Sequence, residues 1–419
     1  MPLIGQFTPP GDKSISHRLI LMSIIANGEM LVSGLSGCDD VNTSLSIFKQ
    51  LGGQAATQAK GLAIKGLGGA FSSEKTLELD CRNSGTTIRL LMGLLSSLKG
   101  RFILDGDNQL RKRPMERVAK PLRAMGAKIE TKSGNPPVII EGSSLAGGDF
   151  QLTQASAQLK SAILLAGLQA SSPTSVTEPA QTRDHTERLI NYWGGRLTSE
   201  GLKNTVQPSS LTLSRFFSTP SDPSSAAFFL VAASIVAGSQ VSAQNMLMSY
   251  GRTGFLRVLD KMGAKVSLTM TGDTPEPTGE VTVQYDGPLK ATTVEADQVP
   301  SLIDEIPILA LAATQAKGTT VFHNVGELRI KETDRLTSIR HQLGALGARI
   351  NVEGDDLIIE GPTSFILPQS LDSGHDHRLA MMLTLALKIA GAKIPIIGEE
   401  SISISYPTFQ DDLNLLWKD

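Results

Sequence analysis

Hydrophobic and polar positions along the chain repeat with a period that predicts one structural unit used several times. An apolar helical stretch ends at a Gly-Ala or Gly-Gly pair, and a segment of alternating apolar and polar residues follows. The pairs recur roughly every seventy residues. Their first glycines are Gly52, Gly126, Gly194, Gly263 and Gly347. Because glycine after the last helical turn is typical of a helix C-terminus, we predict five helices that end there, each followed by a strand.

A second recurring feature is a turn of small and polar residues that opens an apolar helix. It occurs at residues 12–14, 83–86, 155–158, 222–225 and 376–378. Each unit therefore reads as β-α-β-α-β-β, and the chain has room for six. The sixth, from about residue 365, has a long apolar helix but lacks the glycine pair. We predict the α/β class, with apolar helices inside and mixed sheets outside.

Composition excludes several classes of protein. The 419 residues carry 39 Lys and Arg against 41 Asp and Glu, a formal charge of −2, which argues against a dedicated nucleic-acid binder. Cys38 and Cys81 are too few for a disulfide framework or a thiolate metal cluster. The apolar runs at 226–238 and 379–397 are too short or too interrupted to span a membrane. With no pattern of a signal peptide, we expect a cytoplasmic protein.

Cations at predicted helix starts are the first indication of chemistry. A positive side chain opposes the helix dipole at an N-terminus, so its presence there favours a bound anion. Lys13 lies in such a first turn, and Ser14 and Arg18 share a helix face four residues apart. Arg113 precedes Pro114, which we expect at the first position of a helix. Ordinary capped helices with solvated charges are the alternative.

A further segment carries the same signal. Lys331 and Arg335 form a like-charged i,i+4 pair, whose repulsion a bound anion would reverse. Neutralisation by Glu332 and Asp334 is the alternative explanation.

The remaining cations lie at two more predicted helix starts. Arg183 begins an arginine-rich helix, and Arg378 opens the last apolar helix. The neighbouring sequence His375-Asp376-His377 is a poor metal site, because no further ligand cluster accompanies it. Arginine forks suit carboxylate and phosphate groups. The pattern thus indicates an enzyme for small, multiply anionic substrates, without a metal, a Gly-x-Gly-x-x-Gly turn or a Walker loop.

Six motifs in this order resemble those of the enolpyruvyl transferases, over nearly the whole chain, and most closely the branch whose acceptor is shikimate 3-phosphate. Each motif is weak alone, whereas six in order are specific. They lie at residues 10–18, 83–89, 113–115, 156–158, 331–335 and 376–378.

The resemblance implies a two-domain fold with three units in each domain. One domain would comprise residues 1–12 and 220–419, the other residues 13–219, with the active site in the cleft between them. The reaction it implies moves the carboxyvinyl group of phosphoenolpyruvate to the 5-hydroxyl of shikimate 3-phosphate by addition and elimination, on the route to chorismate and aromatic amino acids. It further implies a monomer that needs no cofactor.

The resemblance also assigns residues to the two substrates. Those implied to hold shikimate 3-phosphate are Lys13, Ser14, Arg18, Ser156, Ala157, Gln158, Arg183, Asp304 and Lys331. Those implied to hold phosphoenolpyruvate are Lys13, Gly85, Arg113, Gln158, Arg335 and Arg378. Asp304 matches the acid that takes the hydroxyl proton, the alternative being a helix N-cap. Glu332 and Lys13 are the two choices for protonating the methylene carbon.

Some positions depart from the commonest pattern and bear on inhibition by glyphosate. A lysine of many members is replaced by Ile404, and Leu90 stands where proline is frequent. Gly85 leaves room beside the phosphoenolpyruvate site, which favours inhibition. An Arg-x-His-x-Glu pattern resembles the subgroup that includes glyphosate-insensitive members; it comprises Arg183, His185 and Glu187, with Glu327 further along.

Three other functions compete with this interpretation. The sister transferase that uses UDP-N-acetylglucosamine usually has Lys-Asn at the positions of Lys13 and Ser14, and a cysteine in the loop that here spans 106–113. A nucleic-acid end-processing enzyme of the related cyclase fold would need a basic face and stacking aromatics. A non-catalytic binder of phosphorylated metabolites is disfavoured by the intact Asp304 and Glu332.

Overall fold

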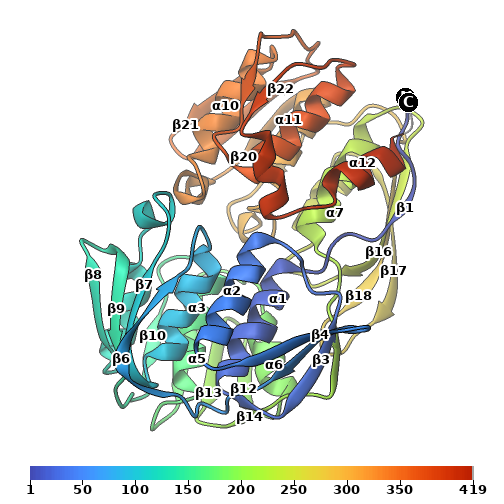
Figure 1. Ribbon diagram of the computed structural model, residues 1–419. Helices are drawn as coiled ribbons and strands as arrows, with labels where there is room; N and C mark the ends of the chain where they lie inside the picture. The colour runs from blue at the N-terminus through green and yellow to red at the C-terminus, as the bar shows by residue number, and fades with distance from the viewer. Residues whose placement is uncertain (418–419) are drawn as a thin grey trace. The chain divides into compact units, whose positions relative to one another are not determined.

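A computed structural model describes residues 1–417, and its internal contacts divide the chain into two compact units (Figure 1). The first unit consists of Met1–Pro10 with Pro220–Asp419, and the second of Gly11–Thr219. The sequence had placed the first crossing after residue 12 and the second after residue 219.

The Gly11–Thr219 unit contains three copies of one sheet. Its strands are β2 (Ala26–Asn27), β3 (Glu29–Ser33), β4 (Gln54–Gln58), β5 (Gly61–Lys65), β6 (Ser72–Asp80), β7 (Lys99–Asp105), β8 (Lys128–Lys132), β9 (Asn135–Glu141), β10 (Asp149–Gln151), β11 (Thr174–Thr177), β12 (Arg196–Glu200), β13 (Lys203–Gln207), β14 (Leu211–Thr212) and β15 (Phe216–Ser218). The sheets run β15-β3-β5-β4, β6-β7-β9-β8 and β10-β11-β13-β12. In each the first pair is parallel and the next two are antiparallel, as expected for mixed sheets.

Three helices form the centre of this unit, and three others pack around them. The helices are α1 (Lys13–Leu21), α2 (Asp39–Gln50), α3 (Gly85–Leu95), α4 (Glu116–Ala124), α5 (Ala157–Gly167) and α6 (His185–Tyr192), with 3₁₀ turns at Met22–Ile24 and Leu110–Lys112. Nearly every residue of α1, α3 and α5 is buried. A Cβ on Gly93 of α3 would lie 2.2 Å from the carbonyl oxygen of Ala162 in α5, so glycine is what lets these two helices approach.

The other unit repeats the plan, with a shortened last copy. Its strands are β1 (Ile4–Phe7), β16 (Gln240–Leu247), β17 (Lys265–Gly272), β18 (Thr278–Gln284), β19 (Thr293–Val294), β20 (Gly318–Phe322), β21 (Arg349–Glu353), β22 (Asp356–Gly361), β23 (Leu371–Asp372) and β24 (Ile396–Ile397). Two four-stranded sheets run β1-β16-β18-β17 and β19-β20-β22-β21, whereas the last sheet is only β23-β24. The sixth unit is therefore shorter than predicted, because a 3₁₀ turn and a short helix follow β24 in place of the glycine pair and its strands.

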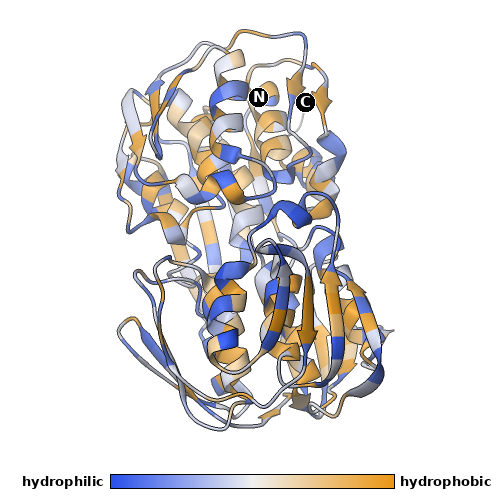
Figure 2. Ribbon diagram, turned by 90° about the vertical axis from the view of Figure 1, so that its left-hand side faces the viewer, coloured by the Kyte–Doolittle hydropathy of each residue, from blue (hydrophilic) through white to orange (hydrophobic). Residues whose placement is uncertain are grey.

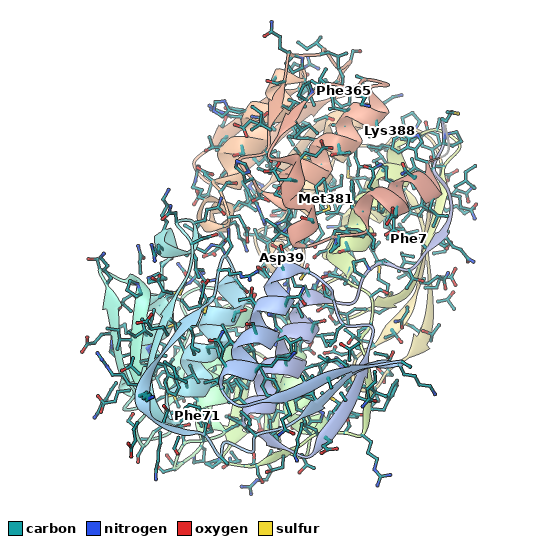
Figure 3. All side chains as sticks on the ribbon, viewed as in Figure 1. Phe7, Asp39, Phe71, Phe365, Met381 and Lys388 are labelled. Atoms are coloured by element: carbon teal, nitrogen blue, oxygen red, sulfur yellow. The ribbon has the colours of Figure 1, made fainter. Side chains whose placement is uncertain are left out.

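The helices of this unit again include three buried central ones. They are α7 (Pro223–Ile235), α8 (Gly254–Lys261), α9 (Ile306–Gln315), α10 (Arg335–Ala345), α11 (His377–Ile389) and α12 (Phe409–Leu416), with 3₁₀ turns at Val299–Ser301, Gly326–Ile330 and Glu399–Ile404. Helices α7, α9 and α11 contact one another and are mostly buried. The strand β1 joins this core through Phe7, labelled in Figure 3, whose ring lies 5.3 Å from that of Phe229.

The prediction of apolar helices inside each unit is confirmed by burial. Figure 2 shows hydrophobic residues, in orange, along the helices and strands of both units. The apolar run from residue 226 lies in α7, whose residues up to Ser234 are all buried. Among residues 1–417, no helix has the length and apolarity needed to cross a membrane.

The five recurring glycines end helices, as the sequence predicted. They follow α2, α4, α6, α8 and α10, with φ angles of +89° at Gly52, +98° at Gly126, +82° at Gly194, +92° at Gly263 and +92° at Gly347. In this left-handed region a side chain with a Cβ is strained, so glycine is the residue of choice.

Replacing one of these glycines gives a test of the repeat. Because a Cβ on Gly263 would meet no atom within 4 Å, Gly263→Ala changes backbone strain alone, and we expect a loss of roughly 1–2 kcal/mol in the free energy of unfolding. Gly344→Ala, inside α10 with ordinary contact to Ile350 at 3.7 Å, is the matched control and should gain about 0.5–1 kcal/mol. Denaturant unfolding measures both; an unchanged Gly263 variant would contradict this role.

Candidate active site

In the Gly11–Thr219 unit, the residues singled out by the sequence gather at the starts of α1, α3 and α5. Each helix is capped by a side chain that accepts a hydrogen bond from its first turn. Asp12 accepts from the backbone N–H of Ile15 at 2.7 Å, Ser84 from that of Thr87 at 3.2 Å, and Ser156 from that of Leu159 at 3.4 Å. Lys13, Gly85 and Ala157 are consequently the first helical residues. The other N–H groups of these first turns, with the helix dipole, favour anions.

Two guanidinium groups lie over the first turn of α3. A Cβ on Gly85 would lie 2.7 Å from Arg113 Nη1 and 3.0 Å from Arg89 Nη1. Arg113 Nη2 also donates to Asn83 Oδ1 at 2.8 Å, and both arginines are largely buried. This corner therefore combines a helix N-terminus with two arginine forks, a combination suited to carboxylate or phosphate.

Gln158 links the starts of α3 and α5. Its Oε1 accepts a hydrogen bond from Arg89 Nη1, and its Nε2 donates to Thr86 Oγ1 at 2.9 Å. These two hydrogen bonds connect the start of α5 to the start of α3, so the polar groups at the two helix starts form one continuous group. The sequence named Gln158, but it gave no role to Arg89, although that residue belongs to the motif at 83–89.

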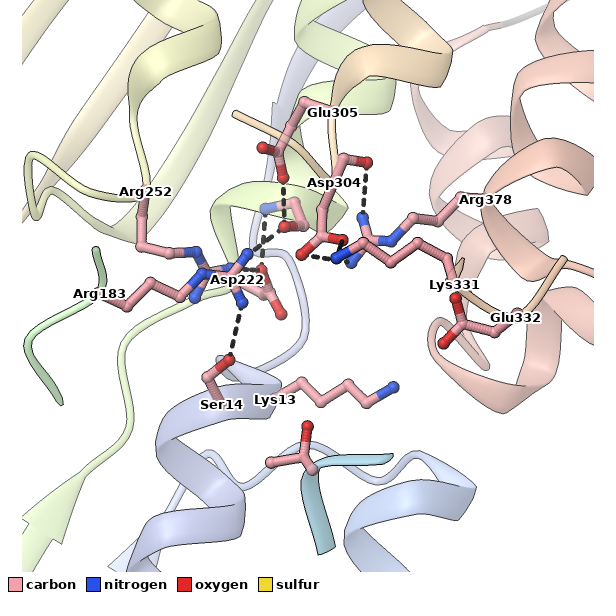
Figure 4. Close-up of polar contacts among 12 residues, drawn as sticks. Lys13, Ser14, Arg183, Asp222, Arg252, Asp304, Glu305, Lys331, Glu332 and Arg378 are labelled. Carbon is pink, nitrogen blue, oxygen red and sulfur yellow. Dashed lines mark hydrogen bonds and ion pairs between the residues drawn. The ribbon is translucent and has the colours of Figure 1, made fainter. Parts of the chain in front are cut away.

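A second group of predicted residues lies at the start of α1. Arg183, from the loop before α6, donates through Nη1 to Ser14 Oγ at 3.2 Å (Figure 4). Lys13 forms an ion pair with Asp40 of α2, which the sequence had not singled out. The sequence gives only a weak indication of this role for Asp40. The residue lies in the acidic first turn of α2, and carboxylates are common in first turns because they interact favourably with the helix dipole.

Arg18 lies deeper than its neighbours and is 2% exposed. It donates to the backbone oxygen of Ser14 at 3.0 Å, as the shared helix face predicted, and to Ser161 and Thr186 at 2.8 and 2.7 Å. Direct contact between Arg18 and a substrate would require some of these hydrogen bonds to be exchanged.

In the other unit, Asp304 lies among three cations. Lys331 Nζ lies 3.8 Å and Arg335 Nη1 3.4 Å from its Oδ1, and Arg378 Nη2 lies 3.9 Å from its Oδ2. Arg378 also donates to the Asp304 carbonyl oxygen at 3.2 Å (Figure 4 shows the contacts with Lys331 and Arg378). Burial lowers the pKa of Lys331, against the attraction of Asp304.

Arg335 holds this second group together. It is 1% exposed, donates through Nε to Asp376 Oδ2 at 2.7 Å, and pairs through Nη2 with Glu332. Burial disfavours its charge, but the carboxylates around it, Asp376 first, outweigh burial and raise its pKa. Asp376 in turn accepts from Arg378 N at 2.9 Å and caps α11.

Two local expectations were wrong, and the alternative given for Asp304 is excluded. Lys331 and Arg335 do not share a helix face, because Lys331 follows a 3₁₀ turn and α10 begins at Arg335; they meet at Asp304 instead. Asp304 is not the N-cap of α9; Glu305 occupies that position, and its side chain does not cap the helix but accepts a hydrogen bond from Ser224. Pro114 precedes the helix, because α4 begins at Glu116 after Met115.

Comparison with known proteins agrees with this arrangement. The EPSP synthase (3-phosphoshikimate 1-carboxyvinyltransferase) family matches residues 1–413. A 3-phosphoshikimate 1-carboxyvinyltransferase of Synechococcus sp. (strain RCC307) is 42% identical over 422 residues, covering 98% of this chain and 96% of the relative. One from Bacillus licheniformis is 40% identical over 419 residues, covering 99% and 97%.

The fold leads to the same family. A structure of EPSP synthase from Acinetobacter baumannii, 39% identical, superimposes with a TM-score of 0.86 and covers 99% of this chain and 96% of that one. A second structure of that enzyme has a TM-score of 0.85 at 38% identity. The chain belongs to the EPSP synthase family, and the enolpyruvyl transferase resemblance of its six motifs is confirmed.

Proposed function

We propose that this chain transfers the carboxyvinyl group of phosphoenolpyruvate to the 5-hydroxyl of shikimate 3-phosphate and releases phosphate. The observation that carries the proposal is full-length membership of the EPSP synthase family. The two groups of arginines, lysines and acids support it, because both substrates carry a phosphate and a carboxylate that need paired donors. We propose further that residues of both units act on the same pair of substrates, and that the chain works as a monomer.

In the Gly11–Thr219 unit, we assign the start of α1 and its surroundings to shikimate 3-phosphate. The residues proposed to hold it are Lys13, Ser14, Arg18, Ser156, Ala157, Gln158 and Arg183. The start of α3 is assigned to phosphoenolpyruvate, through Gly85 and Arg113, and Lys13 and Gln158 are proposed to contact both substrates. The support is physical: each site combines N–H groups of a helix N-terminus with a guanidinium group.

In the other unit, Asp304 is proposed as the base and Glu332 or Lys13 as the acid. Arg335 and Arg378 bind phosphoenolpyruvate, and Lys331 binds shikimate 3-phosphate beside Asp304. Protonation of the methylene carbon makes C2 electrophilic, the 5-hydroxyl attacks C2 as Asp304 takes its proton, and loss of phosphate with a methyl proton restores the double bond. Glu332 can act as the acid only where neighbouring anions favour its protonated form, and two bound substrates supply them.

The position of Gly85 leads to a prediction for inhibition by glyphosate. We propose that glyphosate binds beside Arg113, in the place of phosphoenolpyruvate. Gly85→Ala would put a Cβ 2.7 Å from Arg113 Nη1, so the guanidinium must move away from the start of α3. We expect affinity for glyphosate to fall roughly 10- to 100-fold, the equivalent of 1–3 kcal/mol of overpacking. Inhibition constants for parent and variant measure this, and equal constants would refute the steric argument.

The function is tested by phosphate release with two acceptors in parallel. Phosphoenolpyruvate is mixed with the protein and either shikimate 3-phosphate or UDP-N-acetylglucosamine, with a chelator present. Release with shikimate 3-phosphate alone is the expected result. Release with the sugar nucleotide would move the assignment to the sister transferase, and release with neither would make the chain a non-catalytic binder.

A further inference from the structure

The segment that carries Arg183 is held at both ends by one buried lysine. It runs from the end of β11 to the first turns of α6. Lys160 Nζ, from α5, lies 2.7 Å from Glu178 Oε2 and 2.6 Å from Glu187 Oε1. The side chains of Lys160 and Glu178 are each 2% exposed and that of Glu187 is 6% exposed, so both ion pairs are shielded from water.

The same lysine also acts on the middle of the segment through Glu178. The second carboxylate oxygen of Glu178 accepts a hydrogen bond from Thr182 Oγ1, the residue directly before Arg183. Arg183 then donates to Ser14 at the start of α1. One chain of contacts therefore leads from Lys160 to the guanidinium group at the proposed shikimate 3-phosphate site.

A buried cation with two buried carboxylates is an expensive way to stabilise a fold. Desolvation of the charges opposes much of their attraction, and apolar residues of similar volume are often as stable. Burial raises the pKa of Glu187 against the pull of Lys160, and both carboxylates raise the pKa of Lys160 against burial. The charges instead fix the orientation of the two glutamate side chains, because each carboxylate must point at the one ammonium group.

We propose that Lys160 is a positioning residue, which clamps residues 178–187 through Glu178 and Glu187 and so fixes where Arg183 is presented to its anion. This rests on the proposed function for the identity of that anion, shikimate 3-phosphate. Lys160 touches no substrate, and its effect passes through Arg183. Among the residues proposed for phosphoenolpyruvate, Gly85 and Arg113 lie outside the clamped segment, and Gln158 is held by Arg89 and Thr86 of α3, so the effect falls mainly on shikimate 3-phosphate.

Lys160→Met is the direct test. Misplacement of a binding group by about 1 Å costs up to roughly 10²-fold, so we expect KM for shikimate 3-phosphate to rise roughly 10- to 100-fold. KM for phosphoenolpyruvate should change less than about twofold, because Gly85 and Arg113 lie outside residues 178–187 and Gln158 keeps its hydrogen bonds to Arg89 and Thr86. Backbone hydrogen exchange at residues 180–184 of the free protein should become faster.

A second variant separates the clamp from the stability of the fold. Lys160→Met leaves two buried carboxylates without their cation, so the triple variant Lys160→Met/Glu178→Gln/Glu187→Gln, which buries no charge at these positions, is measured beside it. The same selective rise in KM is expected, because amides do not replace the two ion pairs. Leu165→Ala, fully buried in the same helix, is the matched control and should lower thermal stability without a selective rise in KM.

The outcomes decide between the two proposals. Unchanged KM for shikimate 3-phosphate and unchanged exchange at 180–184 in the folded triple variant would overturn the clamp. Equal changes in both KM values, as from general destabilisation, would also overturn it. A parent protein that releases no phosphate would refute the proposed function, and hydrogen exchange would still decide whether Lys160 orders the segment.

Discussion

Asp304→Asn is expected to lower kcat by roughly 10²–10⁴, the range for loss of a positioned general base. Asparagine keeps the shape of the side chain and can still accept a hydrogen bond from Arg335, but it cannot take the proton of the attacking hydroxyl. Arg378 keeps its hydrogen bond to the backbone carbonyl oxygen of residue 304. Binding of both substrates should therefore remain within a few-fold of the parent. Steady-state kinetics with a separate binding titration measures the two effects.

Asp355→Asn is the matched control for this prediction. Asp355 also pairs with an arginine, Arg329, at 3.3 Å, but it is half exposed and lies outside the proposed site. Its variant should keep full turnover. A normal kcat for Asp304→Asn would remove Asp304 from proton transfer and leave it a purely electrostatic partner of the three cations.

Glu332→Gln is expected to have an effect of the same size, a fall in kcat of roughly 10²–10⁴ with little loss of binding. The amide oxygen can still accept from Arg335 Nη2, so the arrangement around Arg335 is preserved while the transferable proton is lost. A single-turnover experiment with enzyme in excess over substrate measures the chemical step directly.

Glu360→Gln provides the control for Glu332. Glu360 likewise forms an ion pair with an arginine, Arg349, at 3.0 Å, but on an exposed sheet face. We expect no change in turnover there. Turnover near normal in Glu332→Gln would leave Lys13 as the acid that protonates the methylene carbon.

Local features of the sequence were sufficient to predict the repeat. A left-handed glycine at the end of a helix and a capping side chain at the start act within a few residues. Gly126 ends α4 as predicted, and Asp12 caps α1 in the turn that the sequence placed before a helix. The shortened sixth unit was visible only as a missing glycine pair. What replaces the missing strands depends on packing of the last helix, α12, for example Phe409 stacked on Phe229 at 5.2 Å.

Contacts between distant segments were beyond this reasoning. Lys331 and Arg335 were named from the sequence, but their common partner Asp304 precedes α9, on the far side of β20, and no local pattern pairs them. The clamp of Lys160 is a stronger case. A lysine in an apolar helix and two glutamates 18 and 27 residues further along become one buried group only once α5, β11 and α6 are packed.

The most direct measurement for the proposed chemistry is the mass of the product formed in D₂O from phosphoenolpyruvate and shikimate 3-phosphate. Protonation of the methylene carbon creates a methyl group from solvent, and elimination then removes one of its three hydrogens, so deuterium remains in part of the product. We predict release of phosphate together with a deuterium-containing carboxyvinyl group. A carboxyvinyl product without deuterium would contradict addition and elimination through the proposed acid and base, and no product would contradict the transferase itself.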